Sequence, residues 1–572
     1  MKLHTLFIIL LSALVFTLNG CGGGSSSTST PINPTNPTVE VTITDDYQVE
    51  SLGTENTINA KVSLGNTAKD LYLILSNNAN TSASSTIVHN AKVVESGAQS
   101  KSISPTHFMK NPMILRAPQY VREFNKNLKT LLQKKRGIGY QAKSINTTKR
   151  AKDVANSSTS SFCVEINNNG DCTSYTTATA RSVIDVSTEF GEKTLNIWVS
   201  DDSFGSGCSK KKCVTQNMVD QLTNSFLLAG EDNDIYDWVT NIYEEEWGSA
   251  AEAKYSELIP EDDEITILLT DIVGDNSPTG GVIGFFWSKD NLNKATVSGS
   301  NERIMFYADA VMFANGEDGW DIDDFWPKEM ISTLAHEFQH MIHFYQKTIL
   351  LLDANSEGTD VWINEMLSET TEDLIATKIR HIGPRGIEYT DGSDGPTGNT
   401  DGRYPLFNEN NTLSLTAWDN QLADYSKVNA FGAYLIRNYG GAKLLHDIMH
   451  NAHIDEQAIM DAVNKSAEGS GKTFDNLLSE WGTAVLLSNI ESPGNLPTYN
   501  TGWFTDTTYE NSTYEMGSIN FFNYDPLPTI YTRAGTVQAQ GNYYYKVGAD
   551  LTGDVTITLK LNGQTEATLI AK

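Results

Sequence analysis

Two histidines near the middle of the chain, His336 and His340, constrain the fold more than any other pair of residues. They stand in the pattern His-Glu-x-x-His, with Glu337 directly after the first histidine. On a helix, residues four apart lie on the same face, so both imidazoles can bind one zinc ion. Glu337 is then placed to act as general base toward a water molecule on that ion. This chemistry requires a rigid helix and a third ligand from another part of the fold.

The residues around this pattern predict a helix with a buried face. Pro327 suits the first turn of a helix, where its missing N–H is not needed. After it, apolar residues recur at helical spacing on a face that adjoins the two histidines: Met330, Leu334, Phe338, Met341, Ile342 and Tyr345. We therefore expect the hydrophobic core to hold this helix in place.

The third zinc ligand is expected on a second helix. His343 follows on the first helix, but a ligand one turn further along fits a tetrahedral arrangement poorly, so we interpret it as structural. Residues 361–373 carry three acids on one face, Glu365, Glu369 and Glu372, flanked by apolar residues. We predict that Glu365 completes the ligand set and that Glu369, one turn later, orients a ligand imidazole.

These motifs resemble the gluzincins, the thermolysin-type zinc peptidases, in which an Asn-Glu pair such as Asn364-Glu365 supplies the third ligand. More closely, the chain is similar to the hyicolysin family of secreted bacterial metallopeptidases over roughly residues 195–489. The resemblance implies an α+β fold with a zincin-like catalytic domain, made of a mixed sheet, an active-site helix and a mainly helical lower part. The matching stretches are residues 267–272, 332–340, 362–365 and 474–481.

The resemblance also implies two further roles. Gluzincins bind the substrate backbone along an antiparallel edge strand, which residues 284–287 would supply, although an ordinary core strand is the alternative. They also place a donor near the oxyanion, and Tyr425 is our candidate, ahead of His446 and His450. Packing alone is the other interpretation of Tyr425.

The N-terminus looks like a bacterial lipoprotein signal. Residues 1–20 combine a basic start with an apolar run, and Cys21 would become the lipidated first residue. Residues 21–37 form a Gly/Ser/Pro-rich tether. A plain secretory signal or an uncleaved anchor is the alternative. We therefore expect a lipid-anchored protein of the bacterial cell envelope, at the outer membrane or the cell surface.

Four further cysteines suit an oxidising compartment. The short loops favour the pairs Cys163–Cys172 and Cys208–Cys213, and a second zinc site made of these cysteines is the alternative.

Composition separates the rest of the chain into predicted domains. Residues 38–100 and 493–572 alternate apolar and polar residues and are expected to form small β domains that flank a catalytic domain at 156–492. We predict a hairpin that turns at Asn562-Gly563. Residues 101–155 are basic, and from 101 to 152 thirteen Lys and Arg stand against Glu123 as the only acid. They are interpreted as a pro-segment over an acidic cleft or as a basic linker.

The net charge of the chain restricts the classes of partner that it can bind. A formal net charge of −30 and a pI near 4.7 argue against nucleic acid. Polypeptide substrates and, through the lipid, a bilayer are the expected partners, and no obligate protein partner is inferred. Besides Zn²⁺, Ca²⁺ is considered for an acidic loop, although solvated acids are the simpler interpretation. This loop contains Glu317, Asp318, Asp321, Asp323 and Asp324.

The sequence thus predicts a zinc-dependent endopeptidase of extracellular or envelope proteins, with Glu337 as general base. The alternative is a surface adhesin built on a peptidase-like scaffold. An aminopeptidase would need a pocket for the substrate's amino group, and no motif for one is visible.

Overall fold

The computed structural model describes residues 38–91, 114–115, 117–137, 151–260, 263–352 and 357–572. The predicted signal peptide, Cys21, the tether and residues 138–150 of the basic segment lie outside these residues. Among the described helices, none has the length and apolar character needed to cross a membrane. The fold is mixed α+β, as predicted, with several sheets and helices.

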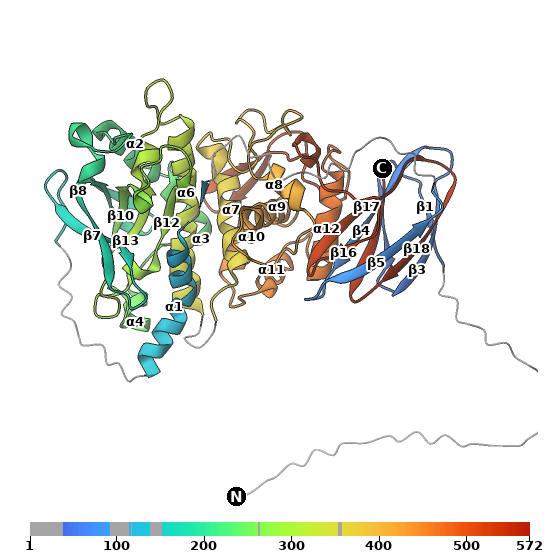
Figure 1. Ribbon diagram of the computed structural model, residues 1–572, viewed down its shortest axis with the longest axis horizontal. Coiled ribbons are helices and arrows are strands. Elements are labelled where there is room, and N and C mark those ends of the chain that lie inside the picture. The colour runs from blue at the N-terminus through green and yellow to red at the C-terminus, as the bar shows by residue number, and fades with distance from the viewer. Residues whose placement is uncertain (1–37, 92–113, 116, 138–150, 261–262, 353–356) are drawn as a thin grey trace, which may run out of the picture. The chain divides into compact units, whose positions relative to one another are not determined.

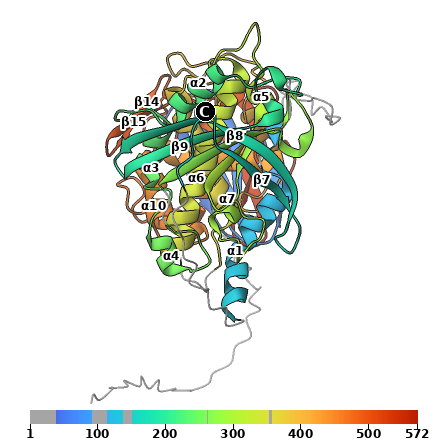
Figure 2. The same cartoon turned by 90° about the vertical axis from the view of Figure 1, so that its left-hand side faces the viewer.

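A six-stranded mixed sheet carries the first half of the catalytic region, in the order β12-β13-β10-β9-β8-β7 (Figures 1 and 2). The three central strands β9, β10 and β13 run parallel, and β7, β8 and β12 are antiparallel to their neighbours. β10 and β13 are buried along their whole length, as expected for parallel strands covered on both faces. The strand bounds are β7 Thr159–Ile166, β8 Cys172–Thr188, β9 Gly191–Ser200, β10 Glu264–Thr270, β12 Gly284–Phe286 and β13 Ile304–Asp309.

Two disulfides brace the margin of this sheet. Cys163 pairs with Cys172 between β7 and β8, and Cys208 pairs with Cys213 before α2. The structure therefore has the local pairing that the short loops predict.

Helices cover the sheet and build the other half of the catalytic region (Figure 1). α6 packs against β12 and β13 on one side and against α7 on the other, and α7 packs on α9. The bounds are α1 Gln119–Gly137, α2 Gln216–Phe226, α3 Ile235–Tyr243, α4 Ala250–Lys254, α5 Ala310–Phe313, α6 Phe325–His343, a π-helical turn Phe344–Leu351, α7 Val361–Lys378, α8 Tyr404–Asn410, α9 Leu422–Asn438, α10 Ala442–Met449, α11 Glu456–Val463 and α12 Phe474–Leu487.

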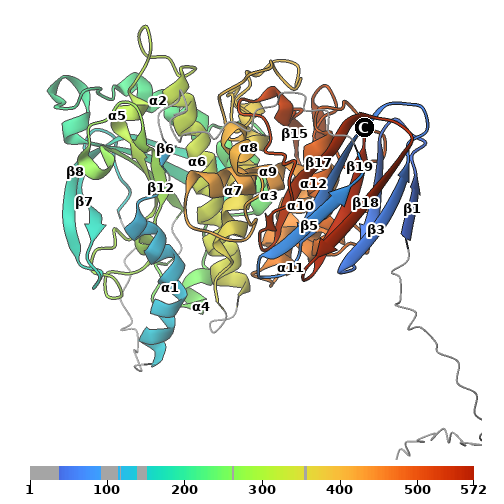
Figure 3. The same cartoon turned by 45° about the vertical axis from the view of Figure 1, so that its right-hand side comes forward.

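The β segments from the two ends of the chain share their sheets. One sheet has the order β1-β3-β18-β5-β16 and the other β17-β4-β19-β2, so each sheet combines strands from residues 38–89 with strands from 536–571 (Figure 3). The segments expected as two flanking β domains are thus joined strand by strand. The bounds are β1 Thr38–Thr42, β2 Gln48–Gly53, β3 Thr57–Ser63, β4 Lys69–Asn77, β5 Ala83–His89, β16 Thr536–Val537, β17 Gly541–Leu551, β18 Asp554–Leu561 and β19 Thr565–Ala571.

The predicted hairpin at Asn562-Gly563 is wrong. β18 pairs with β3 and β5, whereas β19 pairs with β4 and β2 in the other sheet. Leu559 of β18 and Leu569 of β19 are both buried in the core that the two sheets enclose. The turn therefore crosses between sheets, because each strand buries its apolar residues against the opposite sheet.

β4 joins this sandwich to the helical region. Leu71, Leu73 and Leu75 face the core between the sheets, while Tyr72 and Ile74 belong to the main core, where β4 packs on α12. Burial on both faces explains why this strand is a continuous apolar run. The smaller pairs are β6 Ile114–Leu115 with β11 Gly281–Val282, and β14 Thr505–Tyr509 with β15 Ser512–Met516.

Candidate metal centre

The helix α6 is held by aromatic packing on the side away from its histidines. Phe338 is fully buried, and its ring lies 5.3 Å from that of Phe226, 5.6 Å from Tyr236 and 5.9 Å from Phe306. These contacts come from α2, α3 and the sheet. They fix the rotation of α6 about its axis, so His336 and His340 face α7.

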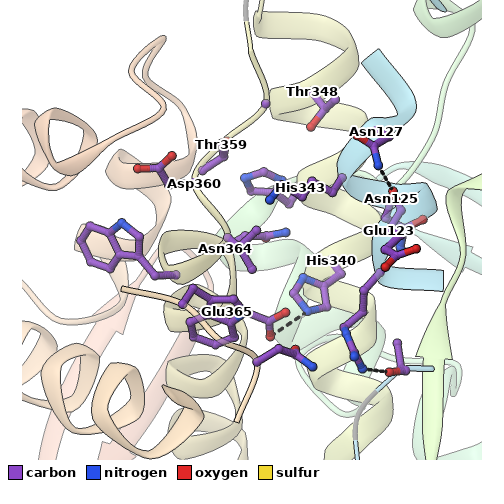
Figure 4. A pocket seen from close by; sticks show the side chains of 18 of the residues that line it. Glu123, Asn125, Asn127, His340, His343, Thr348, Thr359, Asp360, Asn364 and Glu365 are labelled. Atoms are coloured by element: carbon purple, nitrogen blue, oxygen red, sulfur yellow. Dashed lines mark hydrogen bonds and ion pairs between the residues drawn. The ribbon is translucent and has the colours of Figure 1, made fainter. Parts of the chain in front are cut away.

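The structure brings His336, His340 and Glu365 together, and Figure 4 shows His340 beside Glu365. His336 Nε2 lies 3.1 Å from His340 Nε2, and Glu365 Oε2 lies 3.5 Å from the first nitrogen and 3.4 Å from the second. Ligand atoms at about 2.0–2.1 Å from a tetrahedral zinc ion are separated by about 3.4 Å. The three atoms thus have the spacing of three corners of such a tetrahedron.

The environment of Glu365 also fits a metal ligand. Its Oε2 is buried and accepts no hydrogen bond of normal geometry within the described part of the chain. Burial by itself raises the pKa of Glu365, but the nearby imidazoles of His340 and His336 outweigh it and lower the pKa below its ordinary value. An ionised carboxylate facing two imidazole nitrogens is a donor set that zinc accepts.

Glu337 lies on the sheet side of this triad. Its carboxylate Oε2 accepts a hydrogen bond of 2.8 Å from the backbone N–H of Phe286, in the edge strand β12. The side chain is almost wholly buried yet lines the same pocket as His340 and Glu365. The carboxylate is therefore held in one orientation beside the candidate metal position.

The acids of α7 are arranged differently from the sequence expectation. Glu372 Oε1 lies 3.4 Å from His336 Nδ1, whereas Glu369 Oε1 lies 3.9 Å away. Glu369 is instead held by Arg403, whose Nε and Nη2 donate to its two carboxylate oxygens at 2.9 and 3.0 Å. Glu372 is thus the nearer acid to His336, Glu369 faces the same nitrogen from a greater distance, and the role of Glu369 in orienting the imidazole stays a prediction.

Sequence reasoning missed Arg403 and Ser368. Ser368 Oγ lies 3.1 Å from His340 Nδ1 and also donates to Gln339. A buried acid such as Glu369 signals that a cation must lie close by, since unpaired buried charges are costly. No sequence pattern identifies Arg403 as that cation. Residues that hydrogen-bond to a metal ligand without binding the metal themselves, as Ser368 would to His340, fix the orientation of the ligand imidazole.

His343 lies outside the group of three, as the sequence interpretation expects. It is buried, and burial lowers the pKa of its imidazole well below the ordinary value. Tyr425 lines the same pocket as Glu337, its ring packs against Trp418, and its hydroxyl donates to Asn420 Oδ1 at 3.2 Å. The structure therefore places Tyr425 at the pocket wall, and its role as oxyanion donor stays a prediction.

The pocket has a volume of about 1460 Å³, and four helices form a large part of its wall. Glu337 and His340 come from α6, Glu365 from α7, and Tyr425 from α9. The fourth helix is α1, part of the predicted basic segment, which carries Asn125 and its neighbours toward the histidines (Figure 4). α1 thus lies next to the candidate metal centre.

The acidic loop considered for calcium uses its carboxylates within the chain. Asp324 Oδ2 accepts the backbone N–H of Asp321 at 2.9 Å, and Asp323 pairs with Lys328 at 2.7 Å. The calcium prediction remains untested.

Comparisons with known proteins place most of this region in one family. A model of the family described as Peptidase M30 matches residues 173–543. The chain is 25% identical over 307 residues to the neutral metalloprotease ShpI of Staphylococcus hyicus, a match that covers 52% of this chain and 59% of that protein. The chain thus spans about three fifths of the length of that relative.

The similarity to a solved structure is weaker than the similarity in sequence. A mutant M1 zinc metallopeptidase of Deinococcus radiodurans, solved with a Tyr-Ser-Ala substrate, is 12% identical with a TM-score of 0.28. The match covers 57% of this chain and 60% of that one. At this score the likeness carries no argument. The family match includes all of the candidate ligands, Glu337, Arg403 and Tyr425.

Proposed function

This chain belongs to the peptidase M30 family, and from that premise we propose that it is a zinc-dependent endopeptidase. Its proposed substrates are extracellular or envelope proteins. The observation that carries the proposal is the triad of His336, His340 and Glu365, whose ligand atoms have tetrahedral spacing beside an oriented carboxylate. A zinc ion held by these three residues would polarise the scissile carbonyl and acidify the attacking water.

The remaining steps belong to residues of the chain. Glu337 would take the proton of the attacking water and pass it to the leaving amine, which its position beside the triad allows. Tyr425 would donate a hydrogen bond from its hydroxyl to the developing oxyanion from the α9 side of the pocket. Arg403 and Ser368 would keep the ligand side chains in place.

The size of the pocket supports a polypeptide substrate. Sites for small molecules commonly enclose about 300–1,000 Å³, and this pocket is larger, at about 1460 Å³. The edge strand β12 borders it through Phe286. Such a strand can bind an extended peptide by main-chain hydrogen bonds, which is the reason for preferring an endopeptidase.

The proposal keeps the envelope location expected from the N-terminal sequence. Two disulfides support an exported chain, because they persist in oxidising compartments. Lipidation at Cys21 would be seen as a mass increase of the N-terminal peptide and as partition of the protein into detergent.

The test of the activity compares the full chain with Glu337→Gln, using casein as substrate and measuring bound zinc by mass spectrometry. Glutamine can still accept the Phe286 N–H, so this variant keeps the local geometry. We expect it to retain zinc at the triad and to lose casein cleavage by at least about a thousandfold. A wild-type chain that binds zinc without cleaving any peptide would instead support the adhesin alternative.

A further inference from the structure

Two histidines outside the pocket, His446 and His450, lie one turn apart at the end of α10. Their rings are 4.1 Å apart, and Glu244, the residue that ends α3, reaches them from the other side. Glu244 Oε2 lies 3.6 Å from His450 Nε2. One ligand atom from each of the three residues lies within 4.8 Å of the others. The group is distinct from the triad on α6 and α7.

Backbone carbonyls fix the tautomers of both histidines. His446 Nδ1 lies 2.8 Å from Ile242 O, and His450 Nδ1 lies 3.1 Å from His446 O. A carbonyl only accepts, so each Nδ1 carries the proton and each Nε2 keeps a free lone pair. This is the arrangement that orients metal-binding histidines in proteins. His450 Nε2 is buried and has no hydrogen-bond partner among the described residues.

The backbone of Glu244 is strained in a way that aims its side chain at this group. Its φ of 67° and ψ of −170° lie in a region that is essentially reserved for glycine. A residue with a side chain keeps this conformation only where the surrounding structure enforces it. Among the residues that the structure describes, the Glu244 carboxylate pairs with His450 and forms no ion pair with lysine or arginine.

We propose that Glu244, His446 and His450 form a second metal site, for a divalent transition ion of the zinc class. The two Nε2 atoms and the carboxylate supply three ligands, and the exposure of Glu244 leaves room for water as the fourth. The pocket of the candidate catalytic centre is not lined by any of the three, so the site is structural.

The site would join three segments that meet there. Glu244 belongs to the end of α3, which packs against α6, and the two histidines belong to α10. Tyr509 of β14 packs its ring 5.3 Å from that of His446 and accepts a hydrogen bond from Asn241. A metal ion here would stabilise the folded chain, because the unfolded chain lacks the assembled site.

The experiment counts zinc in the dialysed full chain and follows the thermal midpoint on adding zinc. In the double variant His336→Ala/His340→Ala, we expect about one equivalent of zinc and a zinc-dependent rise of the midpoint. Adding His450→Gln should abolish both. A His336→Ala/His340→Ala chain that binds no zinc and shows no shift would overturn the proposal. None of these readouts depends on peptidase activity.

The variant Glu244→Gly tests whether a loss of zinc binding could result from misfolding. Glycine relieves the backbone strain, so the metal-free protein should become more stable than wild type. In the His336→Ala/His340→Ala background, where only the second site remains, Glu244→Gly should at the same time lose the zinc-dependent rise of the midpoint, since a ligand is gone. A full zinc response in Glu244→Gly would contradict the assignment of Glu244 as ligand.

A second inference comes from α1, and it rests on the proposed function. Asn125 of α1 donates its amide Nδ2–H to the carbonyl of Phe286 at 3.0 Å, and its Oδ1 accepts the N–H of Ser288 at 2.9 Å. A residue of an added strand offers one donor and one acceptor to an edge strand in the same way. The Asn125 side chain thus uses backbone groups at β12 that an extended peptide would need.

The helix is anchored around this contact. Tyr120 and Phe124 pack on Trp287 with ring distances of 5.3 and 6.3 Å, and Val121 is fully buried. Leu128 and Leu132 enter the main core. We infer that α1 is an inhibitory segment that covers the edge strand and has to shift before a polypeptide can bind. This favours the pro-segment interpretation of the basic region over the linker.

The test compares kcat/KM for a peptide substrate in Asn125→Ala and in Glu252→Ala, an exposed residue of α4 that does not line the pocket. Asn125→Ala removes both backbone hydrogen bonds at the strand and should raise kcat/KM roughly tenfold, with no change for Glu252→Ala. An unchanged or lower kcat/KM in Asn125→Ala would overturn the inference. Inactivity of the wild type together with both variants would count against the proposed function as well.

Discussion

The backbone N–H of Phe286 donates a hydrogen bond of 2.8 Å to Oε2 of Glu337. It links the edge strand of the sheet to the residue that follows the first histidine of the candidate metal centre. The proposed general base and the strand proposed to bind the substrate are therefore positioned by one contact. A shift of β12 would move the base relative to the scissile bond.

Glu337→Asp tests this coupling. The shorter side chain cannot reach both the Phe286 N–H and the attacking water, so kcat should fall by about a hundredfold or more. Zinc content should not change, because Glu337 is not a ligand. Steady-state kinetics and metal analysis measure the two effects, and a kcat near the wild-type value would show that the contact is dispensable.

Arg403 is predicted to be important for stability. Its guanidinium binds both oxygens of Glu369, a carboxylate with no exposed side-chain surface. Arg403→Ala would leave that charge buried without its guanidinium, at a cost of about 3–5 kcal/mol. The thermal midpoint should fall clearly, and much less in the double variant Arg403→Leu/Glu369→Leu, which removes both charges. Equal losses in the two variants would contradict the pairing argument.

Tyr425→Phe separates catalysis from packing. The ring would keep its contact with Trp418, 5.0 Å away, while the hydroxyl is lost. If the hydroxyl stabilises the oxyanion, kcat should fall by about 10²–10³ with KM, zinc content and thermal midpoint unchanged. An unaltered kcat would leave Tyr425 as a packing residue of the pocket wall.

Deleting residues 541–572 should unfold the N-terminal strands. β4 lies between β17 and β19, so the deletion removes both of its neighbours and exposes Leu71, Leu73 and Leu75. We expect an insoluble chain or rapid proteolysis within residues 38–91. Changing the turn residue Gly563 to Asn, which also tolerates a positive φ, is the matched control and should leave the fold intact.

Lys347 gives a pH-dependent prediction. It is buried with its Nζ donating to Ile448 O, and burial lowers its pKa from 10.5 to about 8, against a smaller opposing effect of Asp455. The folded protein thus favours neutral lysine. Burial of the charged lysine therefore lowers the stability of the folded protein. This destabilisation is fully present below about pH 8 and disappears above about pH 10.5.

Lys347→Met removes this cost and its pH dependence. The advantage of the variant over wild type should shrink by about 2 kcal/mol between pH 7.5 and pH 10, because the folded wild type loses the Lys347 proton near pH 8 while the unfolded chain keeps it until about pH 10.5. Thermal midpoints of both proteins at the two pH values measure the change. A constant difference would show that Lys347 keeps an ordinary pKa in the folded state.

Local spacing in the sequence determined the core of the candidate site. The four-residue interval between His336 and His340, and the helical position of Glu365, are enough to predict which side chains face one another. Helical periodicity depends only on neighbouring residues, so it can be inferred without the rest of the fold. The pairing of the four cysteines could likewise be predicted from the sequence, because each disulfide closes a short loop.

Only the tertiary structure decided the partners of these residues. Arg403 meets Glu369 across 34 residues, and Asn125 meets Phe286 across 161. The hairpin prediction was wrong for the same reason, since the apolar residues of β18 and β19 are equally compatible with pairing of these strands to each other or to β3 and β4. Periodicity fixes which face of an element is buried, whereas the choice of what covers that face depends on packing among distant segments.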